Sequence, residues 1–162
     1  MSVNRYQPHV LVLPEDDANR QVANGFILDP SILMHRIQVL EEAGGWWEVL
    51  QRFQTDHIRG METYRERRIV LLIDFDGQPD RLIEAKRVVP AHLTDRVFIL
   101  GAWNEPEDLK PSLGSFEMIG RAMAKDCRED TNVTWSHALL RHNADEVDRM
   151  RKLVRPILFD RG

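Results

Sequence analysis

The sequence predicts an α/β fold, a three-layer sandwich with a mainly parallel central sheet. Three short apolar runs, at residues 9–13, 69–73 and 97–100, support this prediction. Each run is continuous rather than alternating, which is typical of strands buried on both faces of a parallel sheet. Segments with the spacing of amphipathic helices separate the runs. This alternation of strand and helix favours a parallel sheet that is covered by helices on both faces.

The first half of the chain is expected to contain three helices. Asp16 or Asp17 can cap a helix that runs through Asn24 and ends at Gly25. The short apolar stretch 26–28 is a candidate fourth strand. A helix from 31 to the glycine pair at 44–45 has apolar residues at three-to-four spacing, and a longer helix follows over 47–61.

Three further helices are expected after the second apolar run. Asp80 begins a short helix that stops before Pro90. Ser115 precedes another segment with helical spacing. Asn143 and Glu146 resemble a capping box ahead of a final helix that extends to residue 158.

Length and composition fit a single soluble domain. The chain has 162 residues, of which 43% are hydrophobic and 30% charged, and no apolar run approaches the roughly 20 residues of a membrane span. Residues 1–7 lack the apolar core of a secretory signal, and Cys127 alone excludes a disulfide framework. We therefore expect one cytoplasmic domain over 1–162, with a helical insertion at about 31–66 and no membrane partner.

The net charge of −4 excludes a strongly basic coat for nucleic acid, so any such contact has to come from a local patch.

Acidic residues follow all three apolar runs. They are Glu15, Asp16 and Asp17 after the first, Asp74 and Asp76 after the second, and Glu105, Glu107 and Asp108 after the third. In a parallel sheet these clusters converge on the carboxyl edge, where α/β proteins bind ligands. Carboxylates brought together repel one another, and a hard divalent cation such as Mg²⁺ relieves this repulsion. The alternative is that these acids only cap helices and keep loops soluble.

The order of these acids resembles the TOPRIM domain, a Rossmann-like catalytic fold of topoisomerases, primases and overcoming-lysogenization-defect (OLD) nucleases. That family has a Glu after its first strand and an Asp-x-Asp after a later one, which Glu15 and Asp74 with Asp76 match. The segment 104–109 is similar to a further acidic motif of OLD-like members. The resemblance covers about residues 9–110.

This resemblance implies a site for Mg²⁺ or Mn²⁺. Asp74, Asp76 and Glu105 or Glu107 would be metal ligands, and Glu15 would be a ligand or a general base. The metal would polarise a phosphodiester and lower the pKa of the attacking water.

A cation is also needed to stabilise the charge that develops on the phosphate. Lys125 stands about where OLD relatives carry a Lys, and it is the first candidate for a catalytic cation; Arg121 and Arg20 are the others. Family members usually have Gly directly after the first Glu, whereas this chain has Asp16.

The function expected from the resemblance is that of a nuclease, a metal-dependent phosphodiester hydrolase acting on nucleic acid, with DNA favoured over RNA. OLD nucleases carry an ATPase module in the same chain, so the resemblance implies a separately encoded ATPase partner, with a role in defence or repair. A homodimer is also compatible with it.

Two other functions stay open. The first is a non-catalytic TOPRIM-like interaction module, which Asp16 and the small size favour. The second is a haloacid-dehalogenase-like phosphatase, with Asp74 as nucleophile and Asp76 as general acid.

Overall fold

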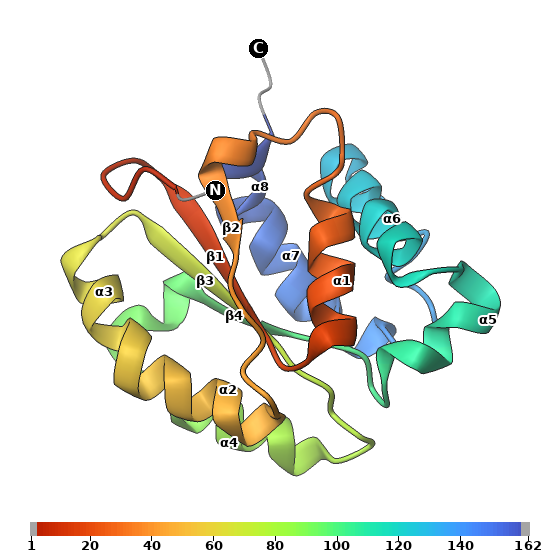
Figure 1. Cartoon of the computed structure of the whole chain (residues 1–162), viewed down its shortest axis with the longest axis horizontal. Helices are drawn as coiled ribbons and strands as arrows, with labels where there is room; N and C mark the ends of the chain where they lie inside the picture. The colour runs from red at the N-terminus through yellow and green to blue at the C-terminus, as the bar shows by residue number, and fades with distance from the viewer. Residues whose placement is uncertain (1–2, 160–162) are drawn as a thin grey trace.

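A four-stranded, all-parallel sheet lies at the centre of the structure, a computed structural model that describes residues 3–159 (Figure 1). The strand order is β2-β1-β3-β4. The strands are β1 (His9–Pro14), β2 (Ile37–Val39), β3 (Arg67–Leu72) and β4 (Val97–Leu100). The prediction of an α/β sandwich with a parallel sheet is therefore confirmed.

Helices cover both faces of the sheet and complete the three layers (Figure 1). One face carries α1 (Asp17–Phe26), α6 (Phe116–Glu129), α7 (Ala144–Leu153) and α8 (Arg155–Leu158). The other carries α2 (Trp46–Arg52), the π-helical turn η2 (Phe53–His57), α3 (Ile58–Thr63) and α4 (Pro79–Arg87). The remaining elements are α5 (Lys110–Leu113) and four 3₁₀ turns, η1 (Met34–Arg36), η3 (Ala91–Arg96), η4 (Pro106–Leu109) and η5 (Arg141–Asn143).

Strand β1 shows why both faces need cover. Val10 and Val12 point into the core beneath α1 and α7, while Leu11 and Leu13 point into the core beneath α2 and α3. Because successive side chains of a strand alternate between faces, a continuous apolar run supplies both cores at once. None of the helices within residues 3–159 is long and apolar enough to cross a membrane.

The helix predicted from residue 31 is wrong, and so is the position of the fourth strand. Residues 37–39 form β2, where Ile37 pairs with Val10 and Val39 with Val12. Two β-branched residues alternate with Gln38 there, and pairing with the free edge of β1 stabilises the extended conformation more than helical spacing favours a helix. The stretch 26–28 instead forms the last residue of α1 and the turn after it.

The helix predicted over 47–61 is confirmed as a helical region, but a π-helical turn interrupts it. The five-residue turn η2 shifts the buried face, so that Phe53 is fully buried and Gln54 is exposed. The helix beginning near Asp80 is confirmed as α4. Ser115 caps α6 as predicted, since its Oγ accepts a hydrogen bond from the Met118 amide at 3.2 Å.

Helix α1 continues past its predicted stop. Gly25 lies inside the helix, where α6 crosses closely: a Cβ at this position would lie 2.2 Å from the Glu117 carbonyl oxygen. The glycine is required for helix packing and not for ending the helix.

The capping box predicted at Asn143 and Glu146 does not form. The Asn143 amide instead exchanges hydrogen bonds with the backbone of Gly101, at 3.0 and 3.3 Å. Glu146 accepts a hydrogen bond from the Ile99 amide at 2.9 Å. Both side chains satisfy backbone groups on the outer edge of β4 and its continuation, which would otherwise lack partners.

Candidate metal centre

Glu15 and Asp74 meet at the carboxyl edge of the sheet because β1 and β3 are parallel neighbours. The pairing of the two strands continues past their ends, since the Glu15 amide donates to the Leu72 carbonyl at 2.9 Å. Asp74 lies two residues beyond β3, where the Asp74 amide donates to Glu15 Oε2 at 2.5 Å. The prediction that the ends of the first two apolar runs converge is therefore confirmed for these two residues.

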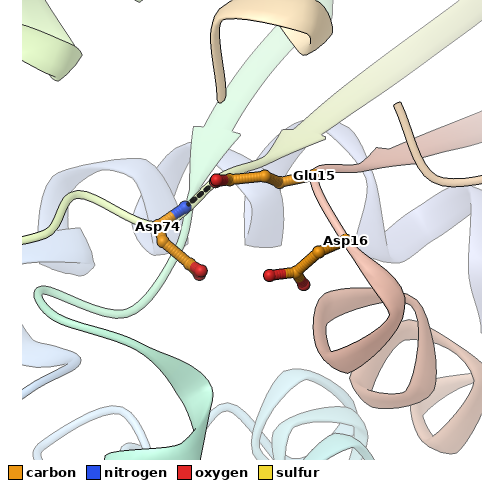
Figure 2. A group of neighbouring side chains, drawn as sticks. All are labelled: Glu15, Asp16 and Asp74. Carbon is orange, nitrogen blue, oxygen red and sulfur yellow. Dashed lines mark hydrogen bonds between the residues drawn. The ribbon is translucent and has the colours of Figure 1, made fainter. Parts of the chain in front are cut away.

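Asp16 completes a cluster of three carboxylates with Glu15 and Asp74 (Figure 2). One oxygen from each residue can be chosen so that all three lie within 4.8 Å of one another. Glu15 is 8% exposed and Asp74 7% exposed, and Asp16 is half-buried. Figure 2 shows the carboxylates of Asp16 and Asp74 turned toward each other, with Glu15 held against the backbone of Asp74.

Asn19 links two of these carboxylates. Its Nδ2 donates to Asp74 Oδ1 at 2.8 Å and to Asp16 Oδ1 at 3.0 Å. Asp16 Oδ1 also caps α1 by accepting from the Asn19 amide at 2.9 Å. The structure gives no donor among residues 3–159 for Asp16 Oδ2 or Asp74 Oδ2, so each has an oxygen free for a ligand.

The cluster raises the pKa values of its buried acids. Burial raises the pKa of Asp74 from 3.8 to about 8, and the charges of Glu15, Asp16 and Glu107 act in the same direction, while the Asn19 hydrogen bond opposes them. Burial also raises the pKa of Glu15, against the opposing hydrogen bond from the Asp74 amide. Ionised together, these groups need a nearby positive charge.

The donor set fits a hard divalent cation. All three groups offer carboxylate oxygens, which are the ligands that Mg²⁺ and Mn²⁺ prefer, whereas no thiol or imidazole belongs to the cluster. The arrangement can therefore collect three ligands from one edge of the sheet and leave the remaining positions to water or substrate.

Asp76 lies outside the cluster. The extended backbone that would carry its side chain beside Asp74 ends here, because Asp76 has a φ of 50° and Gly77 a φ of 65°. Asp76 is exposed and its Oδ2 lies 3.6 Å from Arg81 Nη2. Arg81 Nη1 also donates a hydrogen bond to the Asp74 carbonyl at 2.8 Å, and its guanidinium carbon lies 5.0 Å from the centre of the Trp46 ring. Arg81 therefore fixes the turn behind the cluster.

The third apolar run contributes less than the other two. Glu105 and Glu107 are exposed in and after the loop that follows β4, and neither belongs to the group within 4.8 Å. Glu107 is near enough for its charge to raise the pKa of Asp74.

The candidate catalytic cations are engaged or placed elsewhere. Lys125 is exposed on α6, about one turn before Arg128, which contacts Asp29 beyond the far end of α1 at 3.3 Å. Arg20 forms an ion pair with Asp17, with 2.7 Å between Nη2 and Oδ1. Arg121 pairs with Glu117, with 4.0 Å between Nη1 and Oε1.

Two residues that shape the site were not singled out from the sequence, and a third was placed at the site but given no ligand role. Asp16 was expected at the carboxyl edge as one of the acids after the first apolar run and as a helix cap, and its carboxylate faces Asp74. Asn19 stands in the first turn of α1, three residues after the capping acid, and this spacing is the signal that could have found it. Arg81, in the first turn of α4, has no comparable signal in the sequence.

Comparisons with protein-family models, with curated proteins and with solved structures found no match to this chain.

Proposed function

We propose that this chain is a metal-dependent phosphodiester hydrolase that acts on nucleic acid and holds Mg²⁺ or Mn²⁺ with Glu15, Asp16 and Asp74. One observation carries the proposal: three carboxylates, two of them buried, gather within 4.8 Å at the carboxyl edge of a parallel sheet. Burying ionised carboxylates without a counterion costs free energy, and binding of a cation offsets that cost.

Each residue has a distinct part in this proposal. Asp74 holds a proton at neutral pH in the metal-free protein, because its pKa is about 8, and it releases that proton when the cation binds. Glu15 is oriented by the Asp74 amide, and Asn19 spaces Asp16 from Asp74. A bound divalent cation would supply the Lewis acid that polarises the phosphodiester.

The remaining parts of the proposal rest on the resemblance to TOPRIM domains. DNA is the proposed substrate ahead of RNA, and a separately encoded ATPase and a second copy of this chain are the proposed partners. A role in defence or repair belongs to the same set of proposals.

A non-catalytic, metal-binding interaction module is the second candidate. The ion pair between Asp76 and Arg81 favours this second candidate. Because of that pair, the second aspartate of the Asp-x-Asp motif lies outside the cluster. A phosphatase that uses Asp74 as nucleophile and Asp76 as general acid is less well supported, because Asp76 pairs with Arg81 and lies outside the cluster.

The test combines metal binding with nicking of supercoiled plasmid. Wild-type protein, Asp74→Asn and Glu15→Gln are titrated with Mn²⁺ by calorimetry and then incubated with plasmid and Mn²⁺. Asp108→Asn is the matched control, because it removes one exposed acid from η4, after β4, and leaves the cluster intact.

The nuclease proposal requires that wild type and Asp108→Asn bind Mn²⁺ and nick the plasmid, and that the two cluster variants lose both properties. Binding without nicking supports the interaction module. If the cluster variants bind Mn²⁺ as tightly as wild type does, the metal centre itself is refuted.

A further inference from the structure

A buried arginine lies at the opposite end of the sheet from the acidic cluster. Arg67 is the first residue of β3, in register with His9 of β1, and its side chain belongs to the face that α3 covers. The residue is only 8% exposed. Within residues 3–159 no carboxylate lies within ion-pair distance of its guanidinium, so a charged group is buried without a counterion.

The partners of Arg67 are neutral. Its Nε donates to His9 Nε2 at 2.9 Å, while His9 Nδ1 bonds the Gln7 carbonyl at 2.7 Å. His9 can accept at Nε2 and donate at Nδ1 only in its neutral form. The guanidinium also lies 4.8 Å from the centre of the Tyr64 ring. The terminal nitrogens Nη1 and Nη2 have no hydrogen-bond acceptor among the described residues.

Arg67 lines a cavity of about 320 Å³ between β1, β2 and the α3 side of the fold. Its wall has a polar part, formed by Arg5, Gln38, Asp56, His57, Tyr64 and Arg67, and an apolar part, formed by Val3, Leu11 and Leu40. The volume is in the range of small-molecule sites, and the mixture of an apolar wall with a few polar groups is typical of them.

The polar part of the wall is positively charged. Arg5 lies on the Tyr64 side, where its Nη1 donates to the Tyr64 hydroxyl at 3.4 Å. Asp56 is the one acid in the wall, and it stands beside His57. Burial lowers the pKa of Arg67, and the charge of Arg5 acts in the same direction. Burial also lowers the pKa of His57, where the charge of Asp56 opposes this effect and the charges of Arg67 and Arg52 add to it. An anion in the cavity would relieve both effects.

Gly60 of α3 leaves the space that the guanidinium occupies. A Cβ at this position would lie 2.6 Å from Arg67 Nη1, so any larger residue would displace the guanidinium group of Arg67.

We propose that this cavity binds a small organic anion, with its carboxylate or phosphate group held by the two terminal nitrogens of Arg67 and its apolar part against Leu11 and Leu40. The planar guanidinium offers two parallel donors, which match a carboxylate or a phosphate better than a lysine would. This site is separate from the proposed metal centre and does not depend on it.

The test is a titration followed by ¹H–¹⁵N NMR, with inorganic phosphate in one arm and succinate in the other. We expect saturable shifts of the Gln38, Leu40 and Tyr64 amides in at least one arm, and the arm that saturates first identifies the anionic group. Arg67→Gln should weaken binding at least about tenfold. Arg65→Gln makes the same change of charge at an exposed position and should leave binding unchanged.

A second variant keeps the proposal testable if Arg67→Gln does not fold. Gln38→Glu places a negative charge in the wall without removing Arg67 or His9, and it should also abolish saturable binding. The proposal is overturned if neither anion produces saturable shifts at millimolar concentrations, or if Arg65→Gln weakens binding as much as Arg67→Gln does. Mn²⁺ binding by the acidic cluster should be the same in all of these variants.

Discussion

Replacing Asp74 by asparagine should remove a large pH dependence from the stability of the metal-free protein. Burial raises the pKa of the folded-state carboxyl to about 8, from an ordinary value of 3.8. The folded state therefore keeps a proton that the unfolded chain has already lost at intermediate pH. The contribution of this carboxyl to the free energy of unfolding is fully present below about pH 4, and it is lost as the pH rises toward about 8.

The size of the effect follows from the difference in pKa. About 4 pKa units at about 1.4 kcal/mol each give an upper limit of about 6 kcal/mol, and relaxation around the buried charge reduces this to several kcal/mol. The asparagine side chain introduced by Asp74→Asn is neutral at every pH and can still accept the hydrogen bond from Asn19 through its amide oxygen. The variant should therefore be more stable than wild type by several kcal/mol near pH 8.

The assay is urea unfolding of both proteins in a chelator, repeated between about pH 5 and about pH 8.5. The wild-type free energy of unfolding should fall by about 1.4 kcal/mol per pH unit more steeply than that of Asp74→Asn. Added Mg²⁺ should then stabilise wild type at the upper end of the range and leave the variant unchanged. Parallel pH profiles for the two proteins would refute the assignment of a raised pKa to Asp74.

Two further predictions concern the packing of the fold. Gly25→Ala should lower the free energy of unfolding by about 1 to 3 kcal/mol, because its Cβ would meet the Glu117 backbone. Gly45→Ala, whose Cβ would meet only the flexible Glu48 side chain, is the control in the same urea titration, and an equal loss in both variants would contradict this reasoning. Glu146→Ala should cost about 1 to 3 kcal/mol by leaving the Ile99 amide without its acceptor. Glu146→Gln should restore most of this loss, and full stability of the Ala variant would show that the edge contact contributes nothing.

The sheet could be predicted from the sequence where its strands are buried on both faces. The runs at 9–13, 69–73 and 97–100 are continuous and apolar, as expected for parallel strands that helices cover on both faces. Strand β2 could not be found in this way, because three residues at the edge of a sheet carry too little pattern. Ile37 and Leu40 also satisfy helical spacing, and only the pairing with Val10 decides between the two structures.

The candidate site was half predictable. Strand topology alone brings Glu15 and Asp74 together, and both follow directly from the positions of the apolar runs. The place of Asp76 depends on the left-handed backbone conformation at Asp76 and Gly77, which the spacing of the Asp-x-Asp motif does not specify. The roles of Asn19 and Arg81 depend on where α1 and α4 begin relative to the sheet, and this is a tertiary property.

The outer edge of β4 limits how two copies of this chain can associate. Three side chains form hydrogen bonds with backbone groups on this edge: Arg149 with Val97, Glu146 with Ile99 and Asn143 with Gly101. A strand from a second copy would need the same backbone groups for pairing. A continuous intermolecular sheet across β4 would have to displace all three side chains first. These contacts therefore oppose strand-to-strand pairing of two copies along β4.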